Sequence, residues 1–111
     1  MHVLKKNDKL GIDNRIASFR QIELKLKEEF TEVLDSITKY NQNSNLENLK
    51  EVIRETFDLI QMCILILWKC HRQAKDIDEP ELIQEINFEH KEKIIAREWV
   101  IETGIEIDIK E

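Results

Sequence analysis

Glycine and proline are scarce in this sequence of 111 residues, which contains two glycines and one proline. Because these residues are the usual interruptions of regular structure, their scarcity favours long helices over many short strands. Hydrophobic residues make up 41% of the chain and recur periodically, so they suffice for one compact core despite 36% charged residues. We therefore expect an all-α fold, a helical bundle of three to four helices, in a single domain over residues 1–111.

Cysteines and long apolar runs are also few. Cys63 and Cys70 lie two turns apart in one helical pattern, too far to bridge each other, so we expect reduced thiols and no zinc site. The most apolar run, residues 59–68, is about half as long as a membrane-spanning helix must be. The first residues lack the apolar stretch of a secretory signal. These absences predict a cytoplasmic protein with no membrane partner.

Acidic residues outnumber basic ones by 23 to 17, which gives a formal net charge of −6. A surface of this sign repels the phosphate backbone, so we expect no nucleic-acid partner. Carboxylates can nevertheless serve a smaller phosphate ligand where divalent cations lie between the protein and the phosphate.

Two long helices are expected in the first two thirds of the chain. Apolar residues at steps of three and four indicate a first helix from Asp13, its expected N-cap, to about Tyr40, with a break near residues 21–24 as the alternative. A polar loop follows, and Ser44 with Glu47 has the form of a capping box that opens the second helix. The second helix should end near residue 75. Apolar residues on two of its sides predict a central, buried helix.

A third helix is expected near the C-terminus. Pro80 suits its first turn and Gly104 its C-terminal stop, while the polar residues 87–93 could contain a kink. Residues 105–111 alternate apolar and charged side chains, which is typical of a short strand or a docked extension.

Pairs of carboxylates at i, i+3 occur on both long helices. Glu29 and Glu32 form the first pair, and Glu55 and Asp58 form the second. Residues three apart project to one side of a helix, and the loop allows the helices to run antiparallel. The rise per residue then places the two pairs at comparable heights, so four carboxylates should meet and repel one another unless cations neutralise them.

An all-oxygen ligand set favours Mg²⁺, with Mn²⁺ or Ca²⁺ as alternatives, over zinc or copper. A di-iron bundle would need Glu-x-x-His on two helices, and a calcium loop would need alternating Asp or Asn around a glycine; the sequence has neither. The remaining alternative is that these residues are ordinary solvated helix charges, because a chain rich in Glu and Lys contains such pairs by chance.

The sequence KEEFTE at 27–32, followed by ETFD at 55–58, resembles the EExxE and ExxD motifs of MazG-like nucleoside triphosphate pyrophosphohydrolases. The resemblance covers roughly residues 19–70, and Phe57 stands where many relatives have glycine. It implies an all-α bundle, normally a dimer or a dimer of dimers, that hydrolyses a nucleoside triphosphate to the monophosphate and pyrophosphate. The metal ligands that it implies are Glu29, Glu32, Glu55 and Asp58, with Glu28 as an additional acid.

The expected mechanism uses Mg²⁺ on the four carboxylates to bind the triphosphate, with Glu29 or Glu32 as the catalytic base. Base and sugar recognition should involve aromatic and basic side chains, although the aromatic ones more often belong to the core and the basic ones to a solvated face. The candidates are Trp68, His71, Lys91, Lys93 and Arg97. The competing hypothesis is a catalytically silent helical module that dimerises through its second helix. In either case we expect a homodimer or homotetramer.

Overall fold

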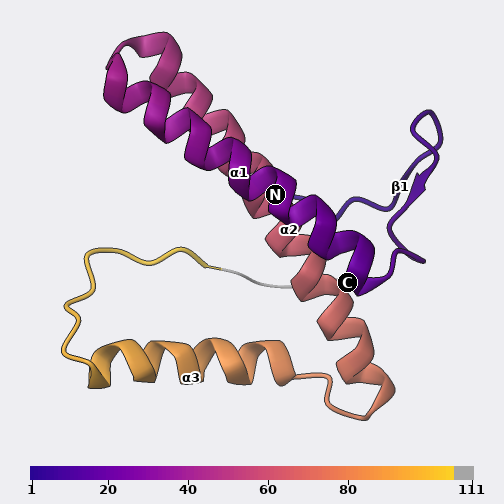
Figure 1. The fold of residues 1–111 in the computed structure, drawn as a ribbon. Helices are drawn as coiled ribbons and strands as arrows, with labels where there is room; N and C mark the ends of the chain where they lie inside the picture. Colours follow the sequence, from indigo (N-terminus) through magenta and orange to yellow (C-terminus); the bar gives the residue numbers. More distant parts are fainter. Residues whose placement is uncertain (107–111) are drawn as a thin grey trace. The chain divides into compact units, whose positions relative to one another are not determined.

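The computed structural model describes residues 1–106 of the chain. Over this range it contains three helices, α1 (Phe19–Gln42), α2 (Leu46–Asp76) and α3 (Leu82–Ala96), and one small two-stranded sheet (Figure 1). The all-α prediction is confirmed. Among the described residues, no helix combines the length and the apolar character needed to cross a bilayer. Most of the predicted tail strand or extension, residues 107–111, lies outside the described residues.

Two compact units make up the chain, and they are described separately. The first is Met1–Lys69, which holds the sheet, α1 and most of α2, and the second begins at Cys70 and holds the end of α2 and all of α3. The expectation of a single domain stays a prediction.

Helix α1 begins later than the sequence periodicity suggested. Its N-cap is Ser18, whose hydroxyl accepts the backbone N–H of Gln21 at 3.1 Å while the Gln21 side chain accepts the N–H of Ser18 at 2.8 Å. This capping box satisfies two N–H groups at the helix start, so the prediction of Asp13 as N-cap is wrong. From Phe19 the helix continues without the break considered at residues 21–24.

Helix α2 begins after the three-residue connection 43–45. The side chain of Asn45 accepts the N–H of Asn48 at 2.8 Å, whereas the Ser44 hydroxyl donates to the carbonyl of Tyr40 at 2.9 Å. The prediction of Ser44 as the capping residue is therefore wrong by one position. Asn45 caps the start of α2, and the Ser44 hydroxyl bonds to the end of α1 instead. Figure 1 shows α1 lying beside the first part of α2, as the predicted antiparallel pair requires.

Helix α3, in the second unit, is unbroken through residues 87–93 and ends at Ala96, so the predicted stop at Gly104 is wrong. The N–H groups of Glu98 and Trp99 donate to carbonyls of the last turn at 2.9 and 3.1 Å. Glu98 takes a φ of 66°, the left-handed conformation that commonly closes a helix. An acidic residue here replaces the glycine that such an end usually has.

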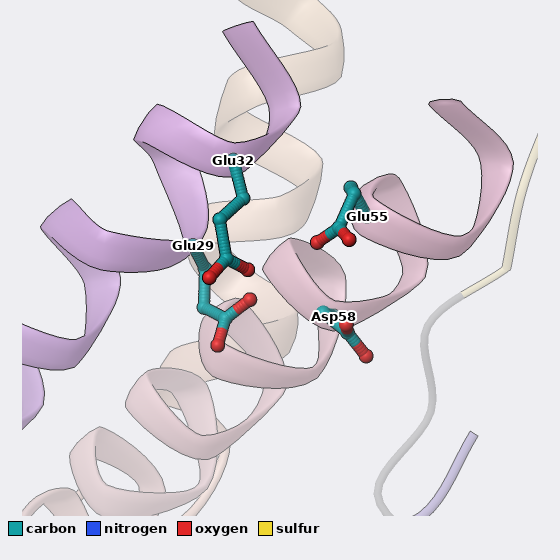
Figure 2. Close-up of side chains that lie close together, drawn as sticks. All are labelled: Glu29, Glu32, Glu55 and Asp58. Carbon is teal, nitrogen blue, oxygen red and sulfur yellow. The ribbon is translucent and has the colours of Figure 1, made fainter. Parts of the chain in front are cut away.

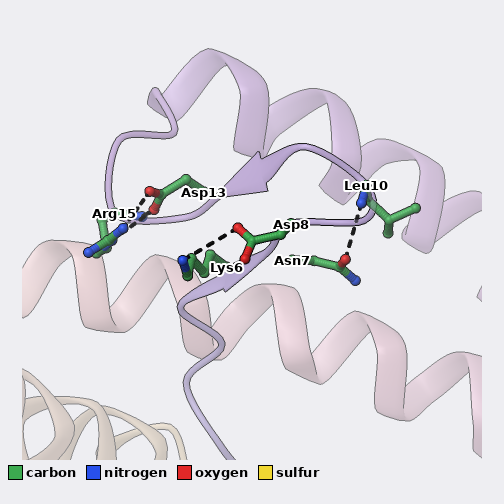
Figure 3. A network of polar contacts seen from close by, with 6 residues as sticks. All are labelled: Lys6, Asn7, Asp8, Leu10, Asp13 and Arg15. Atoms are coloured by element: carbon green, nitrogen blue, oxygen red, sulfur yellow. Dashed lines mark hydrogen bonds and ion pairs between the residues drawn. The ribbon is translucent and has the colours of Figure 1, made fainter.

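The segment before α1 folds into a hairpin that sequence periodicity did not predict. Strands β1 (Lys6–Asn7) and β2 (Ile12–Asp13) pair antiparallel, with Lys6 opposite Asp13. Figure 3 shows the short-range contacts that hold the turn and the start of the next segment: Asn7 with Leu10 at 3.1 Å, Lys6 with Asp8 at 3.4 Å, and Asp13 with Arg15 at 2.8 Å. Gly11 supplies the positive φ of the turn. The Gln61 side chain of α2 donates to the carbonyl of His2 and so ties the hairpin's leading segment to the helix pair.

The apolar stripe of α2 is largely exposed, so the prediction that this helix is buried on two faces is wrong for the chain alone. We define the apolar face by its exposed residues, which lie on the sides of α1 and α2 away from the carboxylate pairs. They are Phe30, Leu34, Ile37, Leu49, Ile53, Phe57 and Ile60. Large apolar side chains exposed in this number are typical of an interface between protein chains.

We expect self-association through the apolar face, which would cover it with a second copy of the chain. Light scattering at micromolar concentration should give a mass of at least a dimer. Ile53→Glu places a charge on this face and should shift the protein toward monomer, whereas Ile77→Glu, at an exposed residue beyond α2, should not. A strictly monomeric unmodified protein would contradict the prediction.

Candidate metal centre

The four carboxylates predicted from the sequence lie together. Glu29 and Glu32 come from α1, and Glu55 and Asp58 come from α2. One carboxylate oxygen of each lies within 4.8 Å of those of the other three. Figure 2 shows the side chains of Glu29, Glu32 and Glu55 turned toward one another between the helices, with Asp58 beside them on α2. The i, i+3 spacing on each helix and the short connection produce this arrangement.

Burial within this cluster is graded. Glu29 is buried, with 7% of its surface exposed, Glu32 and Glu55 are half-buried, and Asp58 is exposed. The Oε2 atoms of Glu29 and Glu55 are both inaccessible to solvent and have no hydrogen-bond partner. A buried carboxylate oxygen without a partner is costly, because it has lost its hydration without compensation. These two atoms therefore indicate that a cation or a donor belongs between the helices.

Lys25 is the cation nearest to the buried carboxylate. Its ammonium group lies 3.2 Å from Glu29 and 3.3 Å from Glu28, and the hydrogen bond to Glu29 is the main reason that the pKa of Lys25 is raised. Lys25 engages the Oε1 atom of Glu29, and the Oε2 atom stays without a partner. Glu28, predicted as an additional ligand, is exposed and lies outside the group of four.

Glu51 is a neighbour of the cluster that the sequence analysis missed. It lies one turn before Glu55, and the hydrogen bond with Glu51, followed by that with Glu32, raises the pKa of Glu55 to about 7. The same contact, together with Arg54 at 3.1 Å, lowers the pKa of Glu51. The four-residue spacing between Glu51 and Glu55 is a signal that could have identified it.

The raised pKa predicts how the metal-free protein responds to pH. Folded Glu55 keeps a proton up to about pH 7 that its unfolded form releases near 4.5, so the folded state binds more protons between these values. The free energy of unfolding should therefore fall as pH rises from about 4.5 to 7 and then level off with respect to this group.

Urea unfolding in the presence of a chelator, at a series of pH values, measures this effect. Glu55→Gln cannot titrate and should lose this part of the pH dependence, whereas Glu47→Gln, at an exposed position on the same helix, should retain it. Identical pH profiles for Glu55→Gln and the unmodified protein would contradict the assignment of the proton to Glu55.

The donor set and its spacing fit a hard divalent cation. Oxygen ligands on opposite sides of one Mg²⁺ lie about 4.2 Å apart, twice the usual bond length. The observed limit of 4.8 Å is only slightly wider, so small side-chain rotations would bring these oxygens into coordination. All four donors are carboxylates, which suits Mg²⁺ or Mn²⁺.

The predicted substrate-binding side chains are dispersed along the chain. Trp68 is half-buried on α2, ten residues after Asp58, which corresponds to about 15 Å along the helix axis. The other candidates belong to the second unit: His71 is buried on α2, Lys91 and Lys93 are exposed on α3, and Arg97 is the C-cap residue of α3. Their role in substrate binding stays a prediction.

Comparisons with known proteins do not place the chain in a family. No family model, curated protein or solved structure matches it. The function must therefore be inferred from the site itself.

Proposed function

We propose that this protein is a magnesium-dependent nucleoside triphosphate pyrophosphohydrolase of the MazG-like type. One observation carries the proposal: the two acidic motifs, 23 positions apart between Glu32 and Glu55, come together in space with their oxygens within 4.8 Å. Ordinary solvated helix charges have no reason to converge, since convergence of like charges is unfavourable. The buried, unpartnered Oε2 of Glu29 supports the same conclusion.

Glu29, Glu32, Glu55 and Asp58 would hold the metal. When bound, Mg²⁺ or Mn²⁺ would neutralise the triphosphate oxygens and the charge that develops on the pyrophosphate leaving group. Lys25 fixes the orientation of Glu29 through its ion pair. Glu55 would release its proton on binding a cation, because an ionised carboxylate is the stronger ligand.

The proposed reaction is the attack of water on the α-phosphorus. A new bond forms between the water oxygen and the phosphorus, and the bond from the phosphorus to the bridging oxygen breaks. Glu29 or Glu32 accepts the proton of the water, and the products are a nucleoside monophosphate and pyrophosphate. Both carboxylates come from α1 and lie next to each other in the cluster (Figure 2).

Pyrophosphate release from a panel of ribonucleoside and deoxyribonucleoside triphosphates, with Mg²⁺, with Mn²⁺ and with chelator, tests the proposal. We expect release that requires the metal, accompanied by an equal amount of nucleoside monophosphate. Release of inorganic phosphate instead of pyrophosphate would contradict the reaction type, and no reaction with any substrate would contradict the enzyme.

The second candidate function is a catalytically silent helical dimerisation module. The exposed apolar face of α1 and α2 supports it, because such a module needs this surface and no metal. The same panel separates the two candidates. Self-association without any metal-dependent turnover would favour the module.

A further inference from the structure

A cavity of about 690 Å³ lies within the first unit, between the N-terminal hairpin and the helix pair. Leu4, Leu10 and Ile12 line it from the hairpin, and Met62 and Leu65 line it from α2. Its volume is within the usual range for small-molecule sites, which is about 300–1,000 Å³. The residues of the hairpin that line it have no role in the reaction proposed above.

The cavity adjoins the four-carboxylate cluster along the same side of the helices. Lys25, which contacts Glu29 at 3.2 Å, is itself part of the cavity wall. On α2, Met62 follows Asp58 by four residues, which is about 6 Å along the axis and on the same side of the helix. A ligand with phosphates at the cluster could therefore place its remaining part in the cavity without leaving the surface of α1 and α2.

The wall of the cavity has the chemistry of a site for a nucleoside. Aliphatic side chains provide packing surface for the faces of a base. The amides of Asn14, Gln21 and Gln61 each use one atom in a hydrogen bond within the fold, and their remaining N–H groups and oxygens can serve the edge of the base. The carboxylate of Asp13, which also lines the wall, is neutralised by Arg15 at 2.8 Å. Lys5 and Lys6 add positive charge to the wall.

We propose that this cavity binds the base and sugar of the triphosphate and that the N-terminal hairpin is the element that sets substrate preference, an inference that rests on the proposed function. Within the described residues no aromatic side chain lines the cavity, so the base packs on aliphatic groups rather than stacking. Discrimination between bases then comes from the amides, since a site built to hydrogen-bond one base leaves its polar groups unpaired with another.

The test fills or charges the cavity while sparing the metal ligands. Ala17 lines the cavity and precedes α1, so Ala17→Phe reduces the available volume without altering the helix. Leu10→Glu places a negative charge at a residue that is 66% exposed, which the fold should tolerate. Ala96→Phe, at the exposed end of α3, is the matched control.

Both cavity variants should raise the KM for the preferred triphosphate roughly tenfold or more. The control should keep the KM of the unmodified protein, and calorimetric titration with Mn²⁺ alone should give the same affinity for all four proteins. An unchanged KM in both cavity variants would overturn the inference and leave the proposed function standing.

If the unmodified protein hydrolyses no triphosphate, the same comparison uses the dissociation constant for α,β-methylene nucleoside triphosphates with Mg²⁺. Binding that Ala17→Phe and Leu10→Glu weaken and Ala96→Phe does not would support the cavity as a nucleoside site while the proposed hydrolysis fails. Absence of nucleotide binding to the unmodified protein would overturn both.

Discussion

Replacing Asp58 with Asn should lower metal-dependent turnover by about 100-fold or more while leaving the helical content unchanged. The amide has the shape of the carboxylate but lacks its charge, so it weakens a metal contact without removing packing. Asp58 is exposed at the edge of the cluster, and the substitution also relieves repulsion among the four carboxylates. The free energy of unfolding of the metal-free protein should therefore stay the same or rise, as expected where function and stability conflict.

Steady-state kinetics with the preferred triphosphate, together with circular dichroism, measure both effects. Glu47→Gln serves as the control, because Glu47 is exposed and its ion pair with Lys50 at 3.3 Å is of the surface kind that contributes little. Near-normal turnover in Asp58→Asn would remove Asp58 from the ligand set. Loss of the helical signal would show that Asp58 serves the fold instead.

Magnesium or manganese should raise the melting temperature of the unmodified protein by roughly 10 °C at a concentration one hundred times the dissociation constant. This follows because binding to the folded state alone adds about 2.7 kcal/mol at that ratio. Glu55→Gln should largely abolish the rise, since it removes a ligand whose Oε2 atom is buried and without a partner.

Thermal unfolding followed by circular dichroism, with metal and with chelator, provides the comparison. Glu85→Gln, at an exposed position on α3, should retain the full metal response. If Glu55→Gln responds as strongly as the unmodified protein, the site lies elsewhere.

The acidic cluster could be predicted because its geometry depends on few variables. The spacing of Glu29 from Glu32 and of Glu55 from Asp58 fixes which side of each helix they occupy, and a short connection fixes the register. Phe57, which departs from the motif, lies on the apolar face rather than in the cluster. The departure therefore does not remove a candidate ligand.

The predicted ends of α1 and α3 were wrong where one local sequence signal competed with another. Ile16 extended the apolar periodicity and placed the start of α1 too early, although the capping box of Ser18 and Gln21 was present in the sequence. At the end of α3, Glu98 adopts the left-handed conformation expected of a glycine, which composition alone does not indicate.

The hairpin and its cavity could not be predicted from periodicity. Each strand has two residues, which is too short for an alternating pattern to be recognised. The hairpin depends instead on individual contacts, such as Asn14 with the carbonyl of Leu4 at 3.0 Å and the link from Gln61 to His2. Contacts between residues this far apart, as with Gln61 and His2, emerge only once the chain is folded.

Only residues 43–45 separate α1 from α2, so the first contacts between these helices, beside this connection, are close in sequence. Such contacts form early in folding, because closing a short loop costs little entropy. If the helices pair at this stage, the negative charges would approach one another in the transition state rather than after it. A divalent cation that bridges them would accelerate folding itself, in contrast to a ligand that engages only the native state and slows unfolding. The proposed metal would thus assist folding as well as catalysis.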